Sequence, residues 1–267
     1  MSRLIDNIAD FLVANGFELS FQIRHDFDVI VTRTLDGRHT KVILPLEISA
    51  GTIEEAEAES ENAEYAIRII TREAGYPLII TEDRWRSQRQ MMEARLLAHL
   101  ELFSQAYARN CEVRRIEKAE AQEFLNRNHS YGDAACQYRY GLFLKRHTGH
   151  IAAEMGFPIR SGMTDEVKNL SEGTLIAVAA FSNARRWLKE GKEIRSYEWT
   201  RYASLPDLRV SGGMGKMLKA FIKEIHPDDI MSYADLEWSE GEVYERLGTG
   251  ATAKKLIEWG MIYEFAS

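Results

Sequence analysis

The first 110 residues alternate between helical and strand patterns of hydrophobic positions. An apolar stripe at helical spacing predicts an amphipathic helix over 3–15, formed by Leu4, Ile5, Ile8, Phe11 and Leu12. Short alternating segments predict an antiparallel meander over 19–24, 27–32 and 41–48. The pattern then predicts an acidic helix over 52–72, a buried strand over 77–83 and a long helix over 84–108. We expect a small α/β domain over 1–110.

The remaining residues, 111–267, predict a second domain with more strands. Strand patterns cover 111–117, 137–145, 174–182, 194–204, 229–235 and the last dozen residues. Helical patterns cover 118–128, 214–225 and 241–248. This order predicts an α/β (α+β) fold in which helices flank a mixed central sheet.

Composition agrees with two folded domains. The chain has 267 residues, 45% of them hydrophobic, and only five prolines. Its two cysteines, Cys111 and Cys136, form no CxxC pair, and we see no secretory leader, so we expect a reducing, cytoplasmic setting. No apolar run approaches the roughly 20 residues that span a bilayer, so we expect a soluble protein without a membrane partner.

Charge is unevenly distributed along the chain. The net charge of −7 argues against a strong general nucleic-acid binder. Residues 139–216 nevertheless carry 13 Lys and Arg against eight Asp and Glu. This basic stretch favours either an anionic ligand or a solvated basic face.

The basic stretch ends in a glycine-rich segment between a predicted strand and a predicted helix. Its residues are Arg209, Val210, Ser211, Gly212, Gly213, Met214, Gly215 and Lys216. Such a turn can present backbone N–H groups and the positive end of a helix to a phosphate, with Arg209 and Lys216 neutralising charge. The segment matches neither GxxxxGK[ST] nor GxGxxG. A turn needed only for close packing is the alternative.

Two motifs together resemble the Gcn5-related N-acetyltransferase (GNAT) superfamily. Its signature R/Q-x-x-G-x-G/A aligns with Arg209, Gly212 and Met214. The final small residue of the signature is therefore missing, unless the alignment shifts to use Gly213 and Gly215. The family's later Y-x-x-x-G-F motif aligns with Tyr244 and Gly248, and Thr249 occupies the position of the phenylalanine.

A closer resemblance is to a phage-associated branch that includes Mom-like DNA-modification proteins and C-terminal domains of phage endonuclease-like proteins. The matching motifs span most of 111–250: NH-x-x-G at 128–132, YGLF, AFS, TRYAS at 200–204, VSGG-x-x-K at 210–216 and YAD-x-x-WS-x-G-x-x-Y-x-x-LG at 233–248. The resemblance implies a GNAT-like fold.

The resemblance also implies a reaction. The glycine-rich segment would hold the pyrophosphate of acetyl-CoA or another acyl-CoA, and Tyr244 would protonate the leaving thiolate. Asp235 and Glu237 share one face of a strand, where they would activate an amine. The alternative is that they only keep an exposed strand edge soluble. His129, Tyr131 and Arg201 would bind the acceptor, for which a flipped or single-stranded base is one candidate. A core position for Tyr244 and a plain surface turn at His129 are the alternatives.

The N-terminal part resembles a very-short-patch-repair type nuclease in degenerate form. Asp28 and Glu47 match acidic positions, whereas the E-x-N-G and W-H elements are missing. This leaves two further hypotheses: a nuclease-derived nucleic-acid-binding protein, and a non-catalytic GNAT-fold interaction protein whose glycine loop is blocked by Met214. His147 and His150 lack the partners of a zinc site, so no metal is expected. The sequence does not indicate an oligomeric state.

Overall fold

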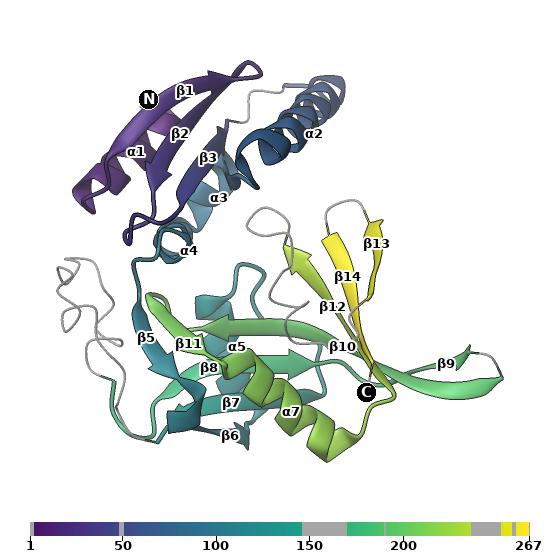
Figure 1. Cartoon of the computed structure of the whole chain (residues 1–267). Coiled ribbons are helices and arrows are strands. Elements are labelled where there is room, and N and C mark those ends of the chain that lie inside the picture. The colour runs from purple at the N-terminus through teal and green to yellow at the C-terminus, as the bar shows by residue number, and fades with distance from the viewer. Residues whose placement is uncertain are drawn as a thin grey trace. The chain divides into compact units, whose positions relative to one another are not determined.

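The computed structural model describes residues 3–47, 51–145, 170–189, 191–235, 252–257 and 260–266, and Figure 1 labels its elements. The chain divides into two compact units, the first over Met1–Leu102 and the second beginning at Phe103. Among the described helices, none is both long and apolar enough to cross a membrane.

The first unit is a four-stranded sheet with helices. Its elements in chain order are α1 (Leu4–Ala14), β1 (Leu19–Arg24), β2 (Phe27–Arg33), β3 (Thr40–Leu46), α2 (Ile53–Ala74), β4 (Leu78–Thr81), α3 (Glu82–Ser87) and α4 (Arg89–His99). The sheet order is β1-β2-β3-β4, with the first three strands antiparallel and β4 parallel to β3. The helix α2 begins with a capping box formed by Thr52 and Glu55.

Hydrophobic clusters lie on both faces of this sheet because its central strands alternate. Ile30 and Ile43 pack with residues of α1 and α4, whereas Val29 and Val42 pack with Ala66 and Ile70 of α2. The apolar stripe predicted for α1 is buried against the first cluster. The α/β pattern predicted for this part is therefore present.

The long helix predicted over 84–108 is wrong. The helical course breaks at Gln88, whose φ is −129°, and α4 ends at His99. Glu101 then adopts a positive φ of 66°. Residues Ser104–Tyr107 form β5, which pairs in parallel with β11 (Leu208–Ser211) more than a hundred residues later. Helical periodicity alone did not reveal that distant strand partner.

The described residues of the second unit form an eight-stranded sheet. After β5 and the short turn η1 (Ala108–Asn110) come β6 (Cys111–Arg115), α5 (Lys118–Asn128), β7 (Tyr138–Leu144), β8 (Leu175–Phe181), β9 (Arg185–Lys189), β10 (Lys192–Ser204), β11, α7 (Gly213–Ile225), β12 (Asp229–Asp235), β13 (Thr252–Ile257) and β14 (Gly260–Ala266). The order is β13-β14-β12-β10-β8-β7-β6, and β9 pairs with β10 alone. The mixed α/β class predicted for this part is confirmed.

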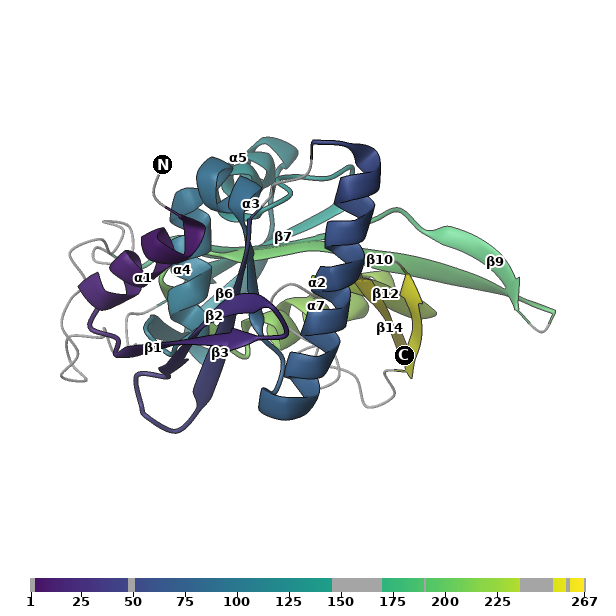
Figure 2. The same ribbon diagram turned by 90° about the horizontal axis from the view of Figure 1, so that it is seen from above.

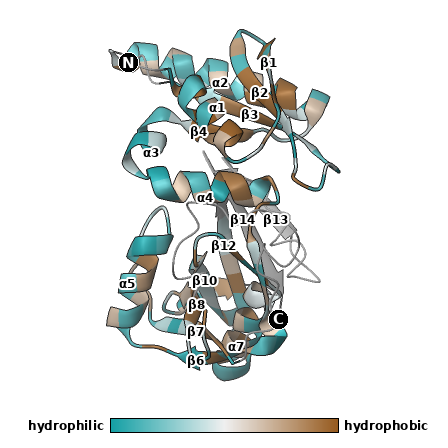
Figure 3. Ribbon diagram, turned by 90° about the vertical axis from the view of Figure 1, so that its left-hand side faces the viewer, coloured by the Kyte–Doolittle hydropathy of each residue, from teal (hydrophilic) through white to brown (hydrophobic). Residues whose placement is uncertain are grey.

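Two helices cover opposite faces of this sheet, as Figure 3 shows with the hydrophobic central strands between α5 and α7. On the α7 face, the ring of Phe221 stacks on Phe181 at a centroid distance of 4.0 Å. Tyr140 contacts the same two rings, and its hydroxyl donates to Glu224 of α7 at 2.8 Å. On the other face, residues of α5 such as Leu125 are fully buried. This core fixes both helices on the strands that carry the site.

Candidate functional site

The glycine-rich segment forms the turn from β11 into α7. Gly212 has a φ of 75°, a left-handed conformation that side chains rarely adopt. Gly213 is buried, and a Cβ atom there would lie 3.1 Å from the hydroxyl oxygen of Tyr202 and 3.1 Å from a Val210 methyl carbon. Conformation therefore favours glycine at the first position, and a side chain at the second position would be tightly packed.

The start of α7 leaves backbone donors unused. The first helical hydrogen bond runs from the N–H of Lys216 to the carbonyl of Gly212 at 3.0 Å. Within the described part of the chain, the N–H groups of Gly213, Met214 and Gly215 have no acceptor. Three unpaired donors at the positive end of a 13-residue helix are suited to an anion.

The side chains around this turn are engaged within the protein. Lys216 donates through Nζ to the carbonyl of Ala108 at 2.8 Å and to that of Cys111. Ser211 accepts a hydrogen bond from Gln105 at 2.8 Å, and the Arg209 guanidinium lies 5.1 Å from the centroid of the Phe103 ring. Met214 packs against the hydrophobic core. The main chain, not Lys216, is therefore the principal set of available donors.

The parallel strands β10 and β12 separate next to this turn. They pair only from Ser196 to Trp199 and from Asp229 to Ser232. Beyond that point β10 continues to Ser204 paired with β8, and β12 continues to Asp235 paired with β14. Figure 1 shows the two strands diverging. Such an opening allows a slender ligand to hydrogen-bond with strand edges.

The opening adjoins the unpaired amides. Tyr202 belongs to the separated part of β10, and its hydroxyl lies against Gly213 at the start of α7. Burial raises the pKa of Tyr202 well above its usual range, so the phenol stays neutral at ordinary pH. The turn and the separated part of β10 are therefore in contact.

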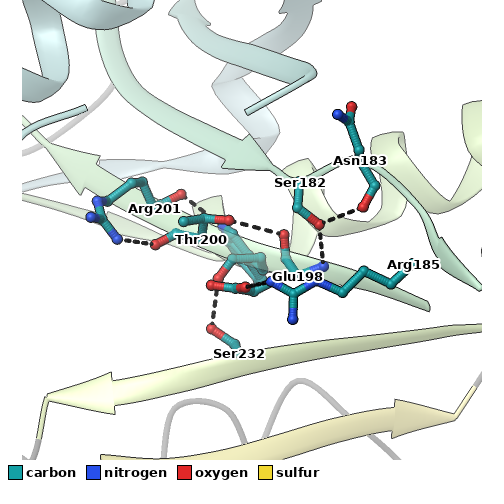
Figure 4. A network of polar contacts seen from close by, with 8 residues as sticks. Ser182, Asn183, Arg185, Glu198, Thr200, Arg201 and Ser232 are labelled. Atoms are coloured by element: carbon teal, nitrogen blue, oxygen red, sulfur yellow. Dashed lines mark hydrogen bonds and ion pairs between the residues drawn. The ribbon is translucent and has the colours of Figure 1, made fainter. Parts of the chain in front are cut away.

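The last paired residues of β10 carry a polar network that Figure 4 shows. The N–H of Glu198 donates to the hydroxyl oxygen of Ser182 at 2.9 Å, and the N–H of Ser182 donates to the carbonyl of Glu198 at 2.9 Å. The hydroxyl of Ser232 donates to the Trp199 carbonyl at 2.9 Å. Register between β10 and β8 shifts between Trp199 and Arg201, so Thr200 forms a bulge. This network fixes the point at which the strands part.

Glu198 was not among the residues singled out from the sequence. Its side chain is 18% exposed, and an oxygen lies 3.8 Å from a nitrogen of Arg185. Neighbouring Tyr197 contacts Phe221 of α7, so strand alternation directs Glu198 to the face covered by α5. One signal was available: it is the only acid in the otherwise half-apolar strand 194–204.

The three residues expected to bind an acceptor do come together. The N–H of Tyr131 donates to Nδ1 of His129 at 3.1 Å, and the two ring centroids lie 6.1 Å apart. Arg201 donates from Nε to the carbonyl of Gly132 at 3.0 Å, with its guanidinium 5.9 Å from the centre of the Tyr131 ring. These contacts form a cation–aromatic cluster at the bulged end of β10.

A buried ion pair supports the turn that carries this cluster. Arg139 and Asp133 approach to 3.5 Å, with side chains 7% and 8% exposed. Arg139 also donates to the carbonyl of Ala134 at 3.1 Å and to that of Cys136. Burial raises the pKa of the Cys136 thiol, as expected for a packed residue and not for a nucleophile.

The residues expected to act in catalysis are Asp235, Glu237 and Tyr244. Asp235 ends β12, but only its main chain is described; Glu237 and Tyr244 lie outside the described residues. His147 and His150 also lie outside them. No group of three or more metal-binding side chains occurs among the residues that are described.

In the first unit, Asp28 and Glu47 both interact with the start of α1. Asp28 forms an ion pair with Arg3, and Glu47 accepts a hydrogen bond from the N–H of Leu4 at 2.8 Å. The guanidinium of Arg3 is also within electrostatic reach of Glu47. The two carboxylates therefore anchor a helix.

Comparison with known proteins adds a weak likeness. No family model matches the chain, and no curated protein does. The crystal structure of a KacTA–DNA complex is similar at 16% identity and a TM-score of 0.32, covering 58% of this chain and 92% of that one. An AtaT mutant toxin bound to the antitoxin AtaR C-terminus and acetyl-CoA gives 12% identity and a TM-score of 0.32, covering 59% and 93%.

A third similar structure is a histone acetyltransferase HPA2 and related acetyltransferase from Corynebacterium glutamicum. Its identity is 16% and its TM-score 0.27, covering 36% of this chain and 61% of that chain. These values are too low to support an argument about function, which has to rest on the geometry of the site.

Proposed function

We propose that residues 111–267 bind acetyl-CoA or another acyl-CoA and transfer the acyl group to an amine. The observation that carries the proposal is the contact between Tyr202 and Gly213, which joins three unpaired helix-start amides to the opening between β10 and β12. A diphosphate and a long flexible arm need these two features side by side.

The chain's own groups suit such a donor. The N–H groups of Gly213, Met214 and Gly215 would hold the diphosphate. The exposed edges of β10 and β12 beyond Trp199 and Ser232 would bind the amide-containing arm, as an added strand does. When bound, the acyl-CoA supplies a thioester already activated for attack by an amine.

Glu198 is the proposed proton acceptor for the attacking amine. It precedes the last paired residue of β10 and lies on the α5 face, and its carboxylate is partly exposed. A carboxylate there would take the proton that an ammonium group loses before attack. Asp235 and Glu237 remain proposals for amine activation, and Tyr244 remains the proposed acid for the leaving thiolate.

The acceptor is proposed to be an amine on a planar group, with a nucleobase as the leading example. The cluster of His129, Tyr131 and Arg201 supports this choice because aromatic rings and a guanidinium bind planar rings by stacking. The motif resemblance to phage Mom-like proteins points in the same direction.

The first unit is proposed to be a nuclease-derived platform without cleavage activity. Asp28 and Glu47 are committed to Arg3 and to the start of α1, so a divalent cation would have to displace these contacts. Incubation of the protein with DNA and Mn²⁺ or Mg²⁺ tests this. Metal-dependent cleavage that Asp28→Ala abolishes would contradict it.

The main test is calorimetric titration of the full chain with acetyl-CoA. Gly215→Pro removes one helix-start N–H but no intrahelical bond, whereas Gly215→Ala keeps that donor. We expect affinity to fall about 10-fold for the proline variant and to stay near the parent value for the alanine variant. Absence of binding by the parent at millimolar ligand would end the proposal.

A further inference from the structure

The hairpin of β9 and β10 extends beyond the strands that flank it, as Figures 1 and 2 show. The register of β10 explains why. Among the described strands, β9 is the one partner of residues Lys192 to Ile194, whereas pairing with β12 begins at Ser196 and pairing with β8 at Trp199. The tip of this arm is therefore a two-stranded ribbon with both faces available to a partner.

On one face of the arm, both arginines are paired with acids. Cross-strand register places Arg186 opposite Arg195 and Leu188 opposite Glu193 on one face. There, Arg186 contacts Glu193 at 2.7 Å, and Arg195 contacts Asp228 at 3.3 Å. Both arginines on this face already have an acidic partner.

The other face, which we call the Trp187 face, consists of Arg185, Trp187, Lys192 and Ile194. Trp187 is 51% exposed, and its indole ring has no aromatic partner among the described residues. Lys192 is exposed and forms no hydrogen bond or ion pair within the described part of the chain. An exposed aromatic residue thus stands beside Lys192 and beside Arg185, which lies 3.8 Å from Glu198, on a protein whose net charge is −7.

The Trp187 face leads to the candidate site. Along β10, alternate residues from Lys192 through Ile194 and Ser196 to Glu198 share one face. Arg185 links the two ends because it pairs with Ser196 in register and contacts Glu198 at 3.8 Å. A polymer lying on the arm would therefore reach the carboxylate at the strand opening.

We propose that the Trp187 face of the arm binds a single-stranded nucleic acid. Cations that track phosphates and an aromatic ring that stacks on a base are the two components of sequence-tolerant strand binding. An acidic peptide would satisfy the cations but would leave the indole without a stacking partner. An unpaired strand also exposes the base amines that pairing hides in a duplex. The binding itself requires no acyl donor.

The experiment is fluorescence anisotropy of a labelled single-stranded dT 15-mer with the full chain, without acetyl-CoA. Trp187→Ala should weaken binding about 5- to 100-fold, the range expected for loss of one stacked base. Leu188→Ala is the matched control because Leu188 is the adjacent residue, 81% exposed, on the opposite face. It should change affinity less than about 2-fold. Trp187→Phe should restore part of the loss.

A duplex of the same length and polyglutamate serve as the other probes. Stronger binding of the duplex, or displacement of the strand by polyglutamate at equal charge concentration, would overturn the proposal. Equal effects of Trp187→Ala and Leu188→Ala, or no binding of the strand, would do the same. Acetyl-CoA titration of Trp187→Ala should match the parent, so failure of the arm and failure of the donor site are distinguishable.

Discussion

The hydroxyl oxygen of Tyr202 lies 3.1 Å from the position that a Cβ atom on Gly213 would occupy. The separated end of β10 is therefore packed directly against the first residue of α7. This contact holds the unpaired helix-start amides beside the opening between two parallel strands. A side chain at Gly213 would require Tyr202 or Val210 to move by a few tenths of an ångström.

Gly213→Val should destabilise the protein by about 1–3 kcal/mol, because its methyl groups would overpack against Tyr202 and Val210. Urea denaturation measures the change in free energy of unfolding. In a Tyr202→Phe background the hydroxyl is absent, so the cost of the valine should be smaller. An equal cost in both backgrounds would show that this contact is not the cause.

Lys216→Met should lower stability by about 1–3 kcal/mol while leaving acetyl-CoA affinity close to that of the parent. The ammonium group donates to the carbonyls of Ala108 and Cys111, which would lose their partner. Thermal denaturation and calorimetric titration of the same variant separate the two effects. A large loss of affinity with unchanged stability would instead assign Lys216 to the phosphates.

Glu198→Gln should reduce the rate of acyl transfer to an amine about 10²- to 10⁴-fold at neutral pH, because the amide cannot accept the proton. Acetyl-CoA binding should persist, since the helix-start amides are unaffected. Glu123→Gln is the control, because Glu123 is an exposed residue of α5 in a surface ion pair. Rates are followed by thiol release, and parent-like turnover by Glu198→Gln would remove its proposed role.

Both cysteines should react slowly with iodoacetamide. Burial raises the pKa of Cys111 and Cys136, so at pH 8 each has a smaller thiolate fraction than an exposed cysteine. The rate should increase as pH rises, because thiolate forms only toward the raised pKa. Mass spectrometry of timed samples, with glutathione as the reference thiol, measures this. Alkylation of Cys136 faster than glutathione at pH 8 would contradict the packed position assigned to it.

Patterns that depend on near neighbours were read correctly from the sequence. The apolar stripe of α1, the meander of β1 to β3 and the amphipathic α7 all follow from which side chains repeat on one face. The same locality identified the glycine turn, because Gly212 needs its left-handed conformation whatever surrounds it.

The functions of individual side chains depended on partners distant in sequence. The helical pattern over 84–108 could not reveal that Ser104–Tyr107 would pair with β11, nor that Lys216 would bind the carbonyls of Ala108 and Cys111. The candidate role of Glu198 depends on the separation of β10 from β12 beside it, which is a feature of the tertiary structure.

The sequence by itself determined the local elements, the glycine turn and the basic character of 139–216, because backbone conformation and periodicity are properties of short segments. Tertiary structure decided which donors of that turn stay unpaired, where two strands separate, and which residues share each face of the β9–β10 arm. Those features arise from pairing between residues far apart in the chain. A short stretch of sequence does not show which distant group will take up a given hydrogen-bond donor or acceptor.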